Sequence, residues 1–133
     1  MSFLNRLFKK SKLRSDVEFS VADHTGNTVL ENNTSKINNP SWDEVCDYLN
    51  IMFSDEEEFV TLTLDYARFE VRYMQSCRTP NGIAVQLGLE KDNKTTLVEK
   101  TCDEKTIMEL FENFYNYGLV EQIETFKPVE FYK

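Results

Sequence analysis

The most strongly patterned part of the chain, residues 39–76, begins with a helical repeat of apolar residues. Polar residues fall between the apolar ones and would occupy the opposite side of a helix. The apolar set is Trp42, Val45, Cys46, Leu49, Met52 and Phe53. Pro40 disfavours helix at the residue before it, and Ser41 followed by Glu44 has the spacing of a capping box. We therefore predict a helix over residues 42–53, with Trp42 and Cys46 in the core.

Apolar and polar residues alternate in several other stretches, which is typical of half-buried strands. The alternating stretches are residues 17–22, 28–31, 60–65, 68–73, 83–90 and 95–101. The short link Asp65–Ala67 predicts an antiparallel hairpin, and so does the turn at residues 23–27. Residues 32–40 are rich in Asn, Ser and Thr, which favours a loop.

The last third of the chain carries a second helical repeat. Its apolar positions are Ile107, Leu110, Phe111 and Phe114. We predict a helix that ends at Gly118 and starts with a capping box made by Thr101 and Glu104. A final strand is predicted over residues 123–131, broken at Pro128 and therefore at a sheet edge.

These elements predict an α+β fold with the order β-β-α-β-β-β-β-α-β, preceded by a short N-terminal helix. Hairpin connections make the sheet mainly antiparallel, and the two amphipathic helices are expected to cover one face of it. Residues 15–133 are expected to form a single α+β domain. Residues 1–14 are set apart as a basic amphipathic N-terminal segment.

Charge is distributed unevenly along the chain. The net charge is −8, but residues 1–14 hold five basic residues and no acid, so the remainder carries −13. Such an acidic body disfavours nucleic acid and favours a basic protein partner. Phe3, Leu4, Leu7 and Phe8 give the basic segment an apolar side that could touch a membrane, although a docked or frayed terminus is favoured. With no spanning apolar run and no signal sequence, the cytoplasm is the expected compartment.

Catalytic and metal-binding patterns are absent from the sequence. Three widely spaced cysteines, without a CxxC pair, and a single histidine do not form a zinc motif or a disulfide framework. We expect no cofactor and no metal. A small enzyme that uses Cys77 or His24 remains an alternative, although no base is specified beside either residue.

Three short segments, Asn39-Pro40-Ser41-Trp42 with the helix after it, residues 59–64 and Tyr73-Met74-Gln75-Ser76, resemble small immunity-type proteins of bacterial polymorphic toxin systems. The resemblance covers residues 15–120 at the level of element order. It implies a non-catalytic protein that binds a cognate toxin domain, often a nuclease, and blocks its active site. An acidic export chaperone is the alternative, although such chaperones begin with a long helix. Both a monomer and a homodimer fit the sequence.

The expected interface is the acidic turn after the first helix. Its carboxylates are predicted to be solvated and to face a basic nuclease groove. The core of this surface is Asp55, Glu56, Glu57 and Glu58. Asp65, Tyr66 and Glu70 are its predicted neighbours, with Tyr66 as the aromatic anchor.

Overall fold

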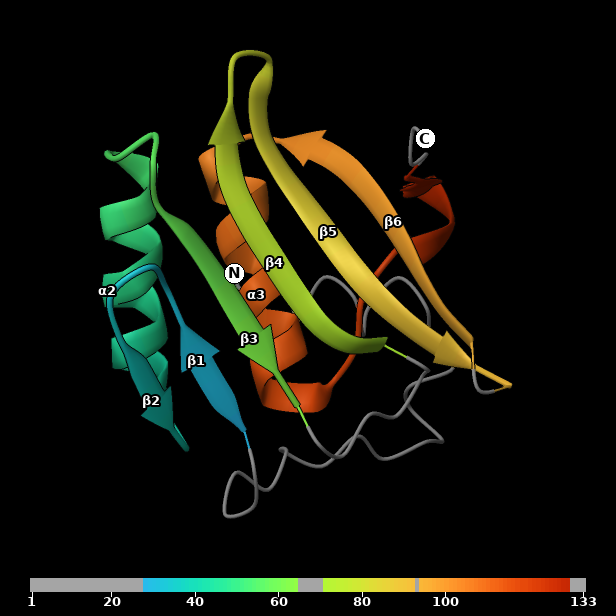
Figure 1. Ribbon diagram of the computed structural model, residues 1–133, viewed down its shortest axis with the longest axis horizontal. Helices are drawn as coiled ribbons and strands as arrows, with labels where there is room; N and C mark the ends of the chain where they lie inside the picture. The colour runs from blue at the N-terminus through green and yellow to red at the C-terminus, as the bar shows by residue number, and fades with distance from the viewer. Residues whose placement is uncertain (1–27, 65–70, 93, 130–133) are drawn as a thin grey trace.

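The computed structural model describes residues 28–64, 71–92 and 94–129 (Figure 1). The predicted N-terminal helix, the predicted strand 17–22, His24 and residues 65–70 lie outside this part of the chain. The described elements are β1 (Val29–Glu31), β2 (Lys36–Asn38), α2 (Trp42–Phe53), β3 (Phe59–Thr63), β4 (Val71–Thr79), β5 (Gly82–Lys91), β6 (Lys94–Cys102), α3 (Glu104–Tyr117), a 3-10 turn η2 (Ile123–Thr125) and β7 (Lys127–Pro128).

The described strands form one antiparallel sheet in the order β2-β1-β3-β4-β5-β6-β7. Helices α2 and α3 lie side by side on one face of this sheet (Figure 1). The predicted α+β class, with a mainly antiparallel sheet and two helices, is therefore confirmed. Neither helix in the described part of the chain is long and apolar enough to cross a membrane.

Helix α2 starts as its sequence predicts. The Ser41 hydroxyl accepts from the Glu44 amide at 3.1 Å, and the Glu44 carboxylate accepts from the Ser41 amide at 2.8 Å. Both halves of the predicted capping box are present, so two amides of the first turn gain partners that the helix cannot supply.

Helix α3 starts differently from the prediction. Thr101 lies inside β6, opposite Ala84, and its capping box with Glu104 is therefore wrong. Asp103 is the N-cap instead, and its carboxylate accepts from the Thr106 amide at 2.8 Å. The predicted stop is confirmed: Gly118 has a φ of 69°, which glycine adopts without a Cβ penalty.

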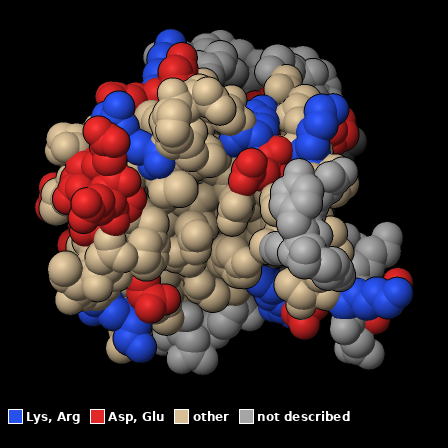
Figure 2. All heavy atoms as spheres, turned by 45° about the horizontal axis from the view of Figure 1, so that its top comes forward, with Lys and Arg blue, Asp and Glu red and all other residues tan. Residues whose placement is uncertain are grey.

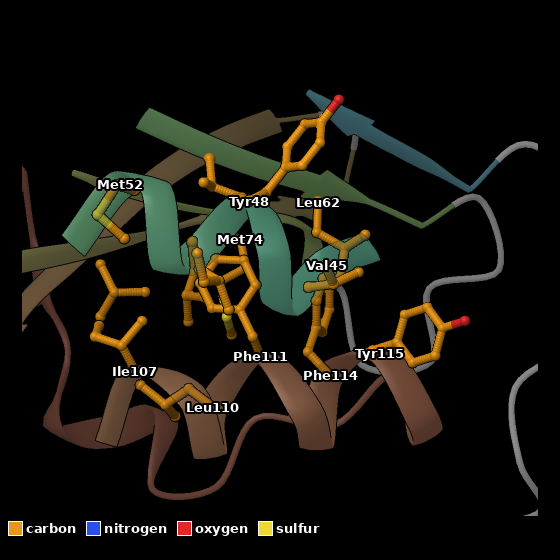
Figure 3. Packing of buried hydrophobic residues seen from close by; sticks show 14 of the residues in the cluster. Val45, Tyr48, Met52, Leu62, Met74, Ile107, Leu110, Phe111, Phe114 and Tyr115 are labelled. Carbon is orange, nitrogen blue, oxygen red and sulfur yellow. The ribbon is translucent and has the colours of Figure 1, made fainter. Parts of the chain in front are cut away.

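The core lies between the helices and the sheet (Figure 3). Val45 and Met52 of α2 and Phe111 of α3 meet Leu62 and Met74 of the strands, and all five are fully buried. The predicted helical stripes therefore do face the sheet. Two members differ: Trp42 and Cys46 are only half-buried. They lie at the border of the stripe, where Trp42 packs on Tyr115 with 5.6 Å between ring centroids.

The hairpin formed by β1 and β2 was not predicted, because residues 32–40 read as a loop. The Asn32 side chain accepts from the Thr34 and Ser35 amides, at 3.0 and 2.9 Å, and so turns the chain back onto β1. The other edge of β1 is paired with β3. Residues 17–22, the partner of this strand in the predicted first hairpin, lie outside the described residues.

The C-terminal segment also differs from the prediction. Residues 123–125 form η2 instead of a strand, because Gln122 has a left-handed φ of 58° that turns the chain. Phe126 is then buried against the core, with the Lys100 ammonium 5.0 Å above its ring. Strand β7 follows at the sheet edge beside β6 and includes Pro128, where proline is tolerated.

Candidate functional site

The acidic turn between α2 and β3 has a defined backbone conformation. The Asp55 carboxylate accepts from the Glu57 amide at 2.9 Å, and the Asp55 carbonyl accepts from the Glu58 amide at 3.1 Å. Asp55, Glu56 and Glu57 are all exposed. Their carboxylates are therefore presented to solvent from an ordered turn, as predicted.

Glu58 contradicts the prediction, because it is buried with only 7% of its surface exposed. Its Oε1 atom accepts from the Asn33 amide at 2.7 Å and from the Phe59 amide at 3.1 Å. The Asn33 side-chain amide in turn donates to the Glu57 carbonyl. Glu58 thus ties the β1–β2 turn to the start of β3 and is not available to a partner.

The remaining predicted interface residues, Asp65, Tyr66 and Glu70, lie outside the described residues. Their place in the interface, including the role of Tyr66 as an anchor, stays a prediction. Of the seven predicted residues, the structure brings Asp55, Glu56 and Glu57 together on one exposed turn.

The outer side of α2 extends this acidic surface, and sequence reasoning missed it. Asp43, Asp47 and Ile51 are exposed and follow one another at intervals of four residues, which places them on one side of the helix. Asp55 comes four residues later, just past the C-cap Ser54. We call Asp43, Asp47, Ile51 and Asp55 the α2 acidic row; the spacing of four was the available signal.

Ile51 is the unusual member of the α2 acidic row. With 49% of its surface exposed, it is the one large apolar side chain among the described residues that lies mainly in solvent. A single exposed isoleucine is ordinary on a protein surface. In the α2 acidic row Ile51 stands between two aspartates, Asp47 four residues before it and Asp55 four residues after it.

The electrostatics at the C-terminal end of α2 are unfavourable for these carboxylates. The helix has no basic residue in its last turn, and its macrodipole places partial negative charge at this end. Arg78 of β4 supplies a cation, and its guanidinium donates to the Phe53 carbonyl. Arg78 also lines a surface hollow of about 360 Å³ together with Glu56, Thr79 and Pro80. Figure 2 shows a dense group of Asp and Glu on the side of the molecule where α2 lies.

The Cys46 thiol lies within the electrostatic influence of carboxylates from both helices. Burial raises the pKa of Cys46, and the charges of Asp43, Glu112 and Asp47 raise it further. Glu112 belongs to α3, so carboxylates from both helices act on this thiol.

The three thiols are free and none is activated. Burial is also the first cause of a raised pKa at Cys77, with Glu99 adding to it, and at Cys102. A thiol whose pKa is raised is a weaker nucleophile at neutral pH, because less of it is thiolate.

No group of three or more His, Cys, Asp or Glu side chains in the described ranges is arranged to hold a metal ion. No protein-family model, curated protein or solved structure matches this chain.

Proposed function

We propose that this chain is a non-catalytic protein-binding module of the immunity type, which neutralises a basic toxin domain in the cytoplasm. The α2 acidic row and the turn residues Glu56 and Glu57 form the contact surface. The observation that carries the proposal is the position of Ile51, an exposed apolar side chain between the carboxylates of Asp47 and Asp55.

This arrangement divides the work of binding between two kinds of side chain. The carboxylates attract a basic partner from a distance and orient it, which raises the association rate. Ile51 supplies the apolar burial that charges alone do not, since burying such a side chain fully is worth about 1.5–3 kcal/mol. A nuclease toxin fits this surface because its substrate groove must be basic to hold phosphates.

The cost of the carboxylates to the free protein also supports a binding role. Asp55, Glu56 and Glu57 follow the negative end of the α2 dipole, where acidic residues are destabilising. Solubility alone could be provided by carboxylates placed elsewhere on the surface. A surface that sacrifices some stability for concentrated charge is typical of an interaction site.

The proposal is tested with an inactive basic nuclease domain captured from the native host or encoded beside this gene. Glu56→Gln with Glu57→Gln should slow association and flatten its dependence on salt, while Glu58 is left intact to preserve the fold. Ile51→Ser should instead accelerate dissociation, because it removes apolar burial and leaves the charges in place.

The matched control is Asp92→Asn with Glu124→Gln. Both residues are exposed, and they lie on the β5–β6 turn and on η2, away from α2. The control removes the same charge, so its association rate should stay close to that of the unmodified chain. Equal effects of the two pairs would mean that only net charge matters. No effect of either pair or of Ile51→Ser would place the contact surface elsewhere.

A further inference from the structure

One feature of the sequence has no part in the proposed contact surface: the basic segment of residues 1–14. It carries Arg6, Lys9, Lys10, Lys12 and Arg14 and no acidic residue. Its apolar residues, Phe3, Leu4, Leu7 and Phe8, recur at helical spacing. The segment therefore has the two properties, positive charge and an apolar side, that the proposed partner needs.

The α2 acidic row is a helix face without a partner in the described part of the chain. Asp43 and Asp47 have no ion-pair partner there, and Ile51 is 49% exposed. Arg78, near the end of α2, already donates to the Phe53 carbonyl. Charges of opposite sign and an apolar residue on each side make the row and the basic segment complementary.

We propose that the α2 acidic row binds residues 1–14 of its own chain, so that the basic segment competes with the toxin for one surface. This inference rests on the proposed function and adds regulation to it. The 13 residues from 15 to 27 connect the segment to Thr28, where the described chain begins. Their contour length of about 45 Å sets the upper limit of this reach, and it exceeds the roughly 35 Å diameter of a domain of this size.

Tethering makes even a weak contact effective. Where the connection is short, attachment to the same chain gives an effective concentration of about a millimolar, so a contact of similar dissociation constant is substantially occupied. A ligand must then displace the segment. Its apparent affinity is the intrinsic affinity multiplied by the fraction of molecules in which the row is free. Weak basic ligands are excluded in this way, whereas a tightly bound toxin still displaces the segment.

The test uses the synthetic peptide 1–14 as the probe and two full-length acceptor chains. One acceptor is the unmodified chain, and in the other Arg6, Lys9, Lys10, Lys12 and Arg14 are all replaced by Gln. Amide chemical shifts report where the peptide binds. We expect saturable binding to the neutralised chain, with shifts centred on residues 43–57, and binding several-fold weaker to the unmodified chain.

Asp43→Asn with Asp47→Asn in the neutralised chain should abolish the shifts, and Asp92→Asn with Glu124→Gln should leave them. A peptide with Phe3, Leu4, Leu7 and Phe8 replaced by Ser should bind more weakly at high salt than the natural peptide, because only its charges remain. Equal affinity of both acceptors, shifts away from α2, or peptide binding to anionic phosphatidylserine vesicles alone would overturn the inference.

The outcomes separate this inference from the proposed function. If the peptide binds the row but the variants of Glu56, Glu57 and Ile51 leave toxin binding unchanged, self-binding stands and the toxin site lies elsewhere. If those variants impair toxin binding and the peptide does not bind, the proposed function stands alone. When both hold, the neutralised chain should bind the toxin more tightly than the unmodified chain.

Discussion

Three adjacent glutamates offer a sharp test of the structure, because only Glu58 is predicted to stabilise the fold. The perturbation is Glu58→Ala, compared with Glu58→Gln and with Glu57→Ala and Glu57→Gln at its exposed neighbour. Glu58 is 7% exposed. One of its carboxylate oxygens accepts hydrogen bonds from two backbone amides, that of Asn33 at 2.7 Å and that of Phe59 at 3.1 Å. The Glu57 side chain is exposed, and only its backbone contributes to the turn.

The magnitude follows from these two hydrogen bonds. A bond to an ionised acceptor contributes about 1.5–3 kcal/mol net, and alanine loses both. Water can reach part of the site and relief of repulsion from Glu57 offsets part of the loss, so we expect Glu58→Ala to cost about 2–4 kcal/mol. Glutamine keeps a carbonyl oxygen in the position of Oε1 without its charge. The bonds then have roughly half their strength, and the expected cost is about 1–2 kcal/mol.

Urea unfolding followed by the fluorescence of Trp42, the only tryptophan, measures these differences. The variants of Glu57 should stay within about 0.5 kcal/mol of the unmodified chain. Hydrogen exchange at the Asn33 amide should accelerate selectively in Glu58→Ala. Equal midpoints for Glu58→Ala and Glu57→Ala would refute the assignment of Glu58 to the fold.

Three further predictions concern packing and capping. Trp42→Ala should lower the free energy of unfolding, measured by circular dichroism, by about 1–3 kcal/mol. This is less than the roughly 3–5 kcal/mol expected for a fully buried indole, and a larger loss would contradict the half-buried position of Trp42. Gly88→Ala should cost about 1–3 kcal/mol, because a Cβ there would lie 2.2 Å from the Tyr73 ring; the cost should shrink in a Tyr73→Ala background, and equal costs in both backgrounds would exclude that clash. Hydrogen bonds from Thr106 lower the pKa of Asp103, so this cap stabilises the fold above the ordinary aspartate pKa and the benefit disappears as the pH falls through the lowered value. The melting temperature of Asp103→Ala should therefore fall below that of the unmodified chain at neutral pH and approach it in strong acid; a constant difference would argue against the cap.

Local features of the sequence were enough to predict the elements whose signals lie within a few residues of one another. The capping box at Ser41 and Glu44 and the stop at Gly118 are of this kind and are confirmed, as is the α2 stripe apart from the half-buried Trp42 and Cys46. Alternation in residues 83–90 likewise predicted β5, and the polar turn after it led to the prediction of a strand over residues 95–101, which is β6. Such features depend on helix or strand periodicity and on cap chemistry, which act over one or two turns.

Features that depend on distant partners were decided only by the tertiary structure. Residues 36–38 form a strand because β1 offers them an edge, despite a loop-like composition. Asp103 displaces Thr101 as the cap because pairing with β5 extends β6 to Cys102.

Glu58 is the clearest case at the candidate site. Its own segment predicts a solvated carboxylate, yet the fold brings the Asn33 amide from 25 positions away to its oxygen. That hydrogen bond offsets the cost of burying the charge and removes Glu58 from the exposed surface. By contrast, the α2 acidic row follows from helical spacing. Packing on the sheet covers one side of the helix, and the row lies on the side that stays exposed.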